Sequence, residues 1–276
     1  MNESFTPINK NVFRFDNQNG GENKTKYVDL KMNGRLFPTW LLRNFNKYKL
    51  KDIVQDDSDP CNKSISKEIK SYQLFLTKYM DFNGSFKDIL IYHGLGSGKT
   101  RSAINIYNML YNYTPGWNVF ILLKATLKDS TWVGELEKWL SKDEYQFRSD
   151  NIIFISYDAP NADKLFQNAI QEADSAKKSL YIIEECHNFI SNVYSNVTSK
   201  QGKRASFIYD YIIQDKKEND STRVICISGT PAINYPFELA LLFNLLRPGI
   251  FPKSESEFNQ IYVSNDDFQQ LIKSKK

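Results

Sequence analysis

The sequence predicts a three-layer α/β domain with a parallel central sheet. Short apolar runs recur along the chain and are separated by segments in which apolar residues have helical spacing. The runs are apolar throughout and do not alternate, as expected for strands covered by helices on both faces. Polar residues follow several runs, at the strand ends where such sheets bind ligands. The five expected strands are 89–92, 119–123, 152–156, 180–183 and 224–227.

A glycine-rich loop follows the first expected strand and leads into a helix that begins at Lys99. Its glycines would let backbone amides turn toward phosphate oxygens, and the helix N-terminus adds partial positive charge. Lys99 would reach the β and γ phosphates of a nucleotide, and the Thr100 hydroxyl would bind Mg²⁺. The pattern departs from a strict G-x-x-x-x-G-K-T at its first position, which is His93. The expected ATP-binding residues of the loop are His93, Gly94, Leu95, Gly96, Ser97, Gly98, Lys99 and Thr100.

Two adjacent carboxylates, Glu184 and Glu185, directly follow the run 180–183. At the tip of a buried strand beside a phosphate loop, one carboxylate can hold the Mg²⁺ shell while its neighbour orients or deprotonates the attacking water. We assign Glu184 to the metal and Glu185 to the water, and we expect Lys99 and Glu185 to be the catalytic residues. Aspartate is the usual metal residue, and because Glu184 is one methylene longer, a water-mediated contact is compatible with it.

The segment 228–234 follows the last apolar run. Small hydroxyl residues at this strand tip could contact both His187, which lies just after the paired glutamates, and a neighbouring domain. Such contacts could relay the state of the nucleotide. We therefore expect His187, Ser228 and Thr230 to couple nucleotide state to movement.

Composition sets the outer bounds. With 276 residues, 41% hydrophobic and 25% charged, the chain is typical of a globular protein, and no apolar run approaches the ~18 residues of a membrane span. The first ten residues lack the apolar core of a signal peptide, which predicts an intracellular protein. Three cysteines without metal-like spacing favour a reducing compartment and argue against a zinc site. A net charge of +4 permits a polyanionic partner without requiring one.

The N-terminal part differs from the rest of the chain. Residues 16–26 are polar and turn-prone, which predicts a mobile linker or loop. Residues 31–51 hold six positive side chains, no acid and four aromatic residues, a mixture that can track a phosphate backbone and stack bases. The alternative, which we favour, is a helix whose buried stripe docks on the main domain. That stripe would consist of Trp40, Leu41, Phe45 and Tyr48.

The motifs together resemble superfamily 2 DExD/H helicases. Segments 93–100, 184–187 and 228–234 resemble motifs I, II and III of that superfamily, and the third resembles its Swi/Snf-like branch. Segment 69–73 resembles the one that reads adenine, 122–127 with 131–136 resembles motif Ia, and 154–157 lies where motif Ib is expected. With 236–238 and 245–249, the pattern is most similar to helicase-like nucleoside triphosphatases of large DNA viruses, such as the poxvirus early transcription factor small subunit and nucleoside triphosphatase I.

The resemblance implies a RecA-like P-loop NTPase domain, preceded by a partly mobile N-terminal extension over residues 1–65. The ATP-binding domain would span 66–250, and 251–276 would be an exposed linker toward a second RecA-like domain that this chain lacks. ATP and Mg²⁺ would be the cofactors, with hydrolysis slow in the first domain alone because the second supplies arginine fingers. Gln73 would read adenine, although it could instead cap a core helix. The implied nucleic-acid contacts are Lys124, Ala125, Thr126 and Ser156.

Three classes of function follow. The leading one is an ATP-dependent motor on DNA or RNA, in a viral, transcription-related setting with a viral RNA polymerase as a further partner and the virion or a cytoplasmic viral factory as its location. The second is an ATP-gated scaffold that binds proteins and has no motor activity. A small-molecule kinase is disfavoured, because kinases seldom combine a Glu-Glu-x-His strand tip with a following Ser-Gly-Thr-Pro.

Overall fold

The structure, a computed structural model, describes residues 31–32, 35–50, 68–199, 202–231 and 234–263. The chain forms two compact units, which divide between Phe86 and Lys87. Residues 68–86, which lie inside the ATP-binding domain expected over 66–250, therefore belong to the N-terminal unit. The predicted mobile segment 16–26 and the cysteine Cys61 lie outside the described residues.

The N-terminal unit is held together by aromatic packing. It contains the antiparallel strands β1 (Lys31–Met32) and β2 (Arg35–Leu36), the helix α1 (Phe37–Phe45), a 3₁₀ turn over Asn46–Tyr48 and the helix α2 (Ser71–Tyr79). Trp40 and Phe45 are buried. The half-buried side chains packed against them are Leu41, Tyr48, Phe75, Tyr79 and Phe86. The four residues of the predicted buried stripe thus belong to one cluster.

The helix α2 begins at Ser71, inside the segment 69–73, and Ile69, which precedes it, is 43% exposed. The cause is local, because the Gln73 side-chain oxygen accepts a hydrogen bond from the Lys70 backbone N–H at 3.0 Å and so caps the helix there.

The main unit is built on a five-stranded parallel sheet. Its strands are β3 (Asp88–Tyr92), β4 (Trp117–Leu123), β5 (Ile152–Ser156), β6 (Lys178–Ile183) and β7 (Arg223–Ser228). Their order in the sheet is β3-β7-β6-β4-β5, and all neighbours run parallel. The strand before the glycine-rich loop therefore neighbours the strand before Ser228, which in turn neighbours the strand before the paired glutamates.

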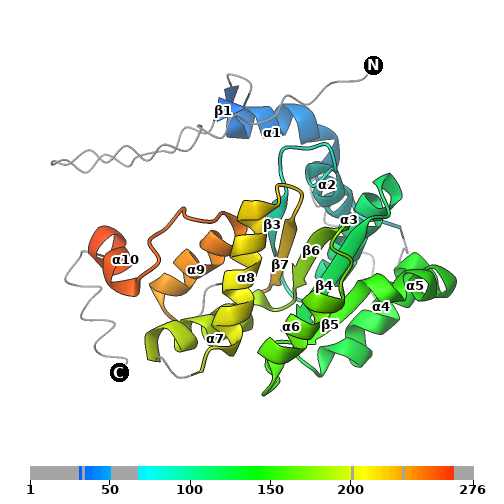
Figure 1. Cartoon of the computed structure of the whole chain (residues 1–276). Coiled ribbons are helices and arrows are strands. Elements are labelled where there is room, and N and C mark those ends of the chain that lie inside the picture. Colours follow the sequence, from blue (N-terminus) through cyan, green and yellow to red (C-terminus); the bar gives the residue numbers. More distant parts are fainter. Residues whose placement is uncertain (1–30, 33–34, 51–67, 200–201, 232–233, 264–276) are drawn as a thin grey trace, which may run out of the picture. The chain divides into compact units, whose positions relative to one another are not determined.

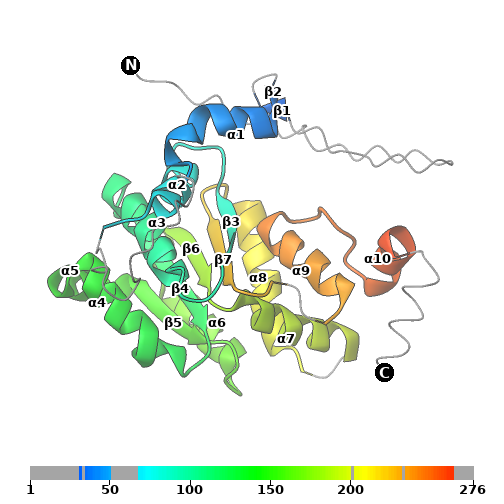
Figure 2. The same cartoon turned by 180° about the vertical axis from the view of Figure 1, so that it is seen from behind.

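Helices cover both faces of this sheet. They are α3 (Lys99–Tyr113), α4 (Gly134–Leu140), α5 (Lys142–Arg148), α6 (Ala162–Glu172), α7 (Cys186–Ser199), α8 (Arg204–Glu218), α9 (Pro236–Leu246) and α10 (Glu255–Tyr262). The two opposite views show α8 in front of the sheet in Figure 1 and α3 in front of it in Figure 2. Every residue of β4 and β7 is buried, as a sheet covered on both faces requires. The predicted three-layer α/β fold with a parallel central sheet is confirmed.

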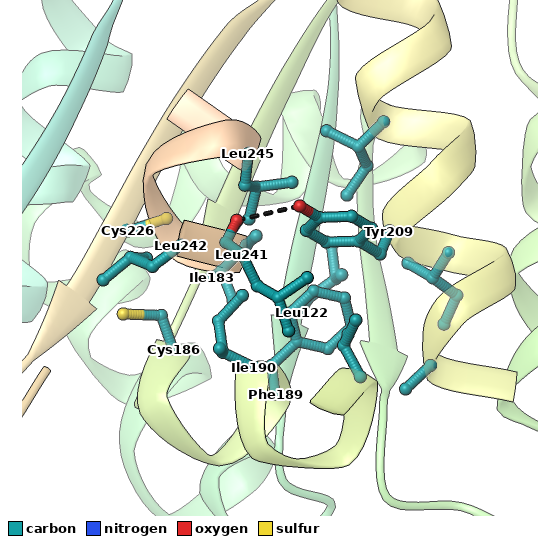
Figure 3. Close-up of a cluster of buried hydrophobic side chains, with 14 of the residues drawn as sticks. Leu122, Ile183, Cys186, Phe189, Ile190, Tyr209, Cys226, Leu241, Leu242 and Leu245 are labelled. Carbon is teal, nitrogen blue, oxygen red and sulfur yellow. Dashed lines mark hydrogen bonds between the residues drawn. The ribbon is translucent and has the colours of Figure 1, made fainter. Parts of the chain in front are cut away.

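The larger part of the core fills the space between the sheet and the helices α6–α9. Alternate strand residues such as Leu122 and Ile183 meet Phe189 and Ile190 of α7 and Leu242 of α9 (Figure 3). Cys186 and Cys226 lie in this cluster as buried free thiols. Burial of this apolar surface supplies the main stabilisation of the layer and fixes the strand tips that follow it.

The segment after Phe251, expected as an exposed linker, includes the helix α10. Phe258 and Val263 pack on the core, at 6% and 8% exposure, whereas the other residues of 252–262 are exposed or half-buried. The aromatic residues Phe251 and Phe258 supply the apolar contacts that hold it. Residues 264–276 lie outside the described residues.

None of the helices in the described ranges combines the length and the apolar character that crossing a bilayer would require.

Candidate functional site

The glycine-rich loop has the backbone that a phosphate cradle needs. Gly96 and Gly98 have φ angles of 73° and 75°, in the left-handed region that glycine enters without strain. Gly98 is the N-cap of α3, so the free N–H groups of that helix point into the loop. The Ser97 hydroxyl donates to the Gly94 carbonyl at 2.8 Å, which closes the loop on itself. The strand-loop-helix order predicted from the sequence is present.

Lys99 is held beneath this loop. Its side chain is buried, with the residue 8% exposed, and its Nζ donates to the Gly94 carbonyl at 3.1 Å. A Cβ added to Gly229 would lie 3.8 Å from the same Nζ and 3.7 Å from the His93 carbonyl oxygen. The segment after β7 therefore lies directly against the loop after β3. Burial and the charge of Lys99 lower the pKa of His93, which favours a neutral imidazole beside the lysine.

Glu184 and Glu185 stand at the tip of β6. The Glu184 backbone N–H donates to the Leu122 carbonyl at 2.9 Å, so the residue still follows the sheet. Glu185 leaves it, with a φ of 46° that is unusual for a residue with a Cβ. The Tyr157 hydroxyl donates to the carbonyls of both glutamates, at 3.3 and 3.5 Å. The two side chains are consequently aimed differently, although they are adjacent in the sequence.

The Glu184 carboxyl is an acid placed in an apolar environment. Burial raises its pKa to about 7, and the neighbouring charge of Glu185 acts in the same direction. The positive charge of Lys99 acts in the opposite direction and lowers the pKa of Glu184. The Trp132 indole N–H also favours the charged form, although no hydrogen bond of normal geometry joins them: Glu184 Oε2 and Trp132 Nε1 are both buried without a partner. The indole is therefore a neighbour of the carboxyl and not its hydrogen-bond partner.

His187 connects the tip of β6 to the tip of β7. Its Nδ1 lies 2.8 Å from the Ser228 Oγ and 3.3 Å from a Glu185 carboxylate oxygen. The Asn188 side-chain amide contacts the other ring nitrogen, Nε2, at 2.9 Å. With Asn188 donating to Nε2, the ring proton sits on Nδ1 and faces Ser228 and Glu185. Burial lowers the pKa of His187 despite the opposing charge of Glu185, so the neutral ring is favoured.

Ser228 connects His187 to the loop that follows β7. Its Oγ also accepts the Thr230 backbone N–H at 2.9 Å, and Ser228 itself is fully buried whereas Thr230 is exposed. The three residues predicted to couple the site, His187, Ser228 and Thr230, are thus linked by hydrogen bonds. Their role in coupling remains a prediction.

The segments expected to touch nucleic acid lie at neighbouring strand tips. Ala125 and Thr126 are exposed after β4, while Lys124 and Ser156 are half-buried. The Ala125 backbone N–H donates to the Asp158 carboxylate at 3.3 Å, which ties the loop after β4 to the loop after β5. Lys124 is close enough to His187 to lower the pKa of that ring. The surface expected to bind nucleic acid therefore borders the site.

Gln73 belongs to the N-terminal unit. Its residue is 2% exposed and its side chain caps α2, which is the structural alternative left open for it. Its proposed contact with adenine stays a prediction.

Sequence reasoning missed three residues of this site. Trp132 and Tyr157 lie within segments that the motifs covered, but their side chains reach the glutamates only through the fold. Asp158 follows Tyr157 and carries no motif signal of its own. Position was the available signal for Tyr157 and Asp158, which directly follow β5 at the edge of the sheet that faces the site. Trp132 lies in the helical segment Lys128–Val133, away from any strand end.

The residues present fit a magnesium-bound triphosphate. The left-handed glycines, the free helix N-terminus and the buried Lys99 suit the phosphates, and the buried, unpartnered Glu184 Oε2 offers an acceptor to a hydrated metal. Within the described ranges, no three His, Cys, Asp or Glu side chains gather into a set that could hold a metal by themselves. Mg²⁺ in nucleotide sites commonly uses one or two protein carboxylates together with phosphates and water.

Comparisons with known proteins agree with this geometry. The family model described as SNF2-related domain matches residues 39–273. The protein R350 of Acanthamoeba polyphaga mimivirus, whose name proposes an ATP-dependent RNA helicase, is 49% identical over 98% of this chain and 34% of its own length. Nucleoside triphosphatase I of Melanoplus sanguinipes entomopoxvirus is 27% identical over 81% of this chain and 33% of its own. The chain spans about a third of the length of these curated relatives.

Among solved structures, the Sulfolobus solfataricus SWI2/SNF2 ATPase core in complex with dsDNA aligns with 74% of this chain and 40% of its own, with a TM-score of 0.45 and 18% identity. The family match covers most of the chain, and the mimivirus relative matches nearly all of it. The chain therefore belongs to the SNF2-related domain family of superfamily 2, which groups ATP-dependent helicases and nucleoside triphosphatases.

Proposed function

We propose that this chain binds Mg²⁺ and ATP, hydrolyses ATP, and acts as the first motor domain of a nucleic-acid translocase. The observation that carries the proposal is the meeting of three loops at one edge of the sheet. Lys99 from the first loop lies beside Gly229 of the third and influences the Glu184 carboxyl of the second. Three loops converging on a buried lysine and a buried acid match the needs of a triphosphate site.

Each side chain has a distinct task in this proposal. Lys99 releases the Gly94 carbonyl and binds phosphate oxygens, while Thr100 and Glu184 hold the Mg²⁺ shell. Glu185 accepts a hydrogen bond from the attacking water and aims it, and His187 keeps the Glu185 carboxylate in place. Bound ATP supplies the phosphoanhydride bond that is cleaved. Arginines from a second RecA-like domain would speed this reaction further.

Nucleic acid is the proposed partner for the exposed loops after β4 and β5. Ala125 and Thr126 are accessible, and Lys124 offers a positive charge at the same strand tip. The name of the mimivirus relative mentions RNA, but the proposal treats DNA and RNA as equal candidates. Because the matched relatives are viral, the proposed setting is a viral one, in the virion or a cytoplasmic factory, with an RNA polymerase as a further partner.

The test is ATP hydrolysis measured without nucleic acid and with duplex DNA, single-stranded RNA or duplex RNA. Lys99→Ala should lower the affinity for a fluorescent ATP analogue at least about tenfold and abolish turnover. Lys164→Ala removes an exposed lysine from α6 and serves as the charge-matched control. Normal hydrolysis by Lys99→Ala would overturn the proposed site. ATP binding without stimulation by any of the nucleic acids would favour the protein-binding scaffold.

A further inference from the structure

Tyr157 joins two loops that the motifs treat separately. It directly follows β5 and is 3% exposed, with its ring packed against Phe189 of α7 at 5.7 Å between centroids. Its hydroxyl reaches across to the tip of β6, where it contacts the carbonyls of Glu184 and Glu185 at 3.3 and 3.5 Å. Burial raises the pKa of Tyr157, so the hydroxyl keeps its proton and acts as a donor at any working pH.

One of these carbonyls belongs to a strained residue. Glu185 has a φ of 46°, a backbone conformation that is unfavourable for a residue with a Cβ. Such a conformation persists only where the surroundings hold it. The Glu185 carbonyl accepts the Asn188 N–H at 2.8 Å from within its own turn, and Tyr157 is the donor that reaches it from another strand.

The next residue, Asp158, faces the proposed nucleic-acid surface. It is exposed, and its carboxylate accepts the Ala125 backbone N–H at 3.3 Å. The dipeptide Tyr157–Asp158 therefore contacts the loop after β4 through one side chain and the loop after β6 through the other. A shift of the loop after β4 would move Asp158. Because Asp158 is bonded directly to Tyr157, the shift would also change the hydrogen bond from Tyr157 to the Glu185 carbonyl.

We infer that Tyr157 is a positioning residue that holds Glu185 in its left-handed backbone conformation, and that Asp158 links this support to the loop containing Ala125. Nucleic acid bound at that loop would thereby adjust the aim of the Glu185 carboxylate. The inference rests on the proposed function and adds to it a route between its two surfaces.

The first test is the kinetics of Tyr157→Phe, which removes a single oxygen atom. The expected result is a fall in kcat of about tenfold with the KM for ATP unchanged, since nucleotide binding does not depend on the aim of Glu185. Tyr209→Phe is the matched control. Tyr209 is also buried, at 6% exposure, and donates to a backbone carbonyl, that of Leu241 at 2.9 Å, away from the site (Figure 3). It should leave kcat and KM unchanged.

The second test does not depend on hydrolysis. The Asn188 amide bonds to the Glu185 carbonyl, so its hydrogen exchange reports on that carbonyl. Tyr157→Phe should speed this exchange about fivefold, as the loss of one hydrogen bond implies, whereas Tyr209→Phe should not. If the wild type lacks hydrolysis, the proposed function fails, and the inference is judged on exchange alone. Wild-type kcat in Tyr157→Phe, or unchanged Asn188 exchange, would overturn the inference while leaving the proposed function standing.

A pair of Asp158 variants tests the link to the loop. Asp158→Ala removes the acceptor of the Ala125 N–H and should reduce the factor by which nucleic acid stimulates hydrolysis by about fivefold. Asp158→Asn keeps an oxygen that can accept this hydrogen bond and should retain most of the stimulation. Equal stimulation in the wild type and Asp158→Ala would overturn the proposed link.

Discussion

The His187 ring Nδ1 lies 2.8 Å from the Ser228 hydroxyl oxygen, although the two residues are 41 positions apart in the chain. The contact arises because β6 and β7 are neighbours in the sheet, with Ile183 level with Cys226. The residues that follow each strand therefore emerge side by side. Since Glu185 contacts the same ring nitrogen at 3.3 Å, a change at Ser228 can alter the hydrogen bonding of the proposed water-orienting carboxylate.

Ser228→Ala tests whether this contact couples nucleotide state to the partner. The variant loses the His187 contact and leaves the Thr230 N–H without its acceptor, at an expected cost of about 1 kcal/mol in unfolding free energy. ATP affinity should be retained while stimulation of hydrolysis by nucleic acid falls. Both are measured by analogue binding and by the ratio of stimulated to basal rates.

The control for Ser228→Ala comes from the opposite end of β7. Thr222→Val removes a buried hydroxyl that bonds to Asp215 at 3.2 Å, and it should lower stability without changing the ratio of rates. An unchanged ratio in Ser228→Ala would contradict the coupling role.

Glu185→Gln tests the separation of roles between the paired glutamates. The substitution keeps the size of the side chain and an oxygen that can accept from His187, but removes the carboxylate charge. Hydrolysis should fall at least about a hundredfold while analogue binding is retained, because general-base assistance contributes on that scale. Single-turnover rates and binding titrations provide the measurement. Wild-type turnover in this variant would move the water-orienting role to Glu184.

Much of the fold is predictable from the sequence because burial imposes composition on the strands. The expected strand at 152–156 matches β5, and the other four lie within observed strands that are one or two residues longer. The extensions include Asn118, Lys178 and Arg223, where the pattern of apolar residues is interrupted. The order β3-β7-β6-β4-β5 is not encoded in any local pattern, since it depends on which sheet edges the connecting helices reach.

Some residues of the site were likewise predictable from the sequence, and others were not. Lys99 and the paired glutamates were predictable because each follows an apolar strand and belongs to a short motif. Tyr157 and Trp132 were not, because a buried aromatic residue after a strand fits core packing equally well until its polar atom is seen near a carbonyl or carboxyl. The packing of α10 within the expected linker after Phe251 was not predictable for a related reason. Its Ser and Glu residues dominate the composition, whereas the few apolar residues, such as Phe258, decide the packing.

Trp40→Ala tests the structural interpretation of the basic aromatic stretch at 31–51. Trp40 is 7% exposed and makes edge contacts with Phe45 and Phe86 at 5.6 and 5.8 Å, so its face is not free to stack on a base. The variant should lower the unfolding free energy of the N-terminal unit by about 3–5 kcal/mol. Leu42→Ala, at a position 65% exposed, should cost little. Urea unfolding followed by hydrogen exchange in α2 measures both, and a stable Trp40→Ala with weakened nucleic-acid binding would instead support base stacking.

Glu184→Gln tests the buried acid through the pH dependence of stability, measured without nucleotide or Mg²⁺. The pKa of Glu184 is about 7 in the folded chain, against a reference value of 4.5. Between these values the folded state keeps a proton that the unfolded state releases, so stability falls as pH rises through this window. Above pH 7 the full cost is about 3 kcal/mol.

His187, with its pKa lowered, contributes a slope of the opposite sign below about pH 6.5, but it does so in both proteins. The variant should therefore equal the wild type near pH 4.5 and exceed it at pH 8 by up to about 3 kcal/mol in urea unfolding. Parallel stability curves for the two proteins would show that the Glu184 carboxyl is not held in the environment described.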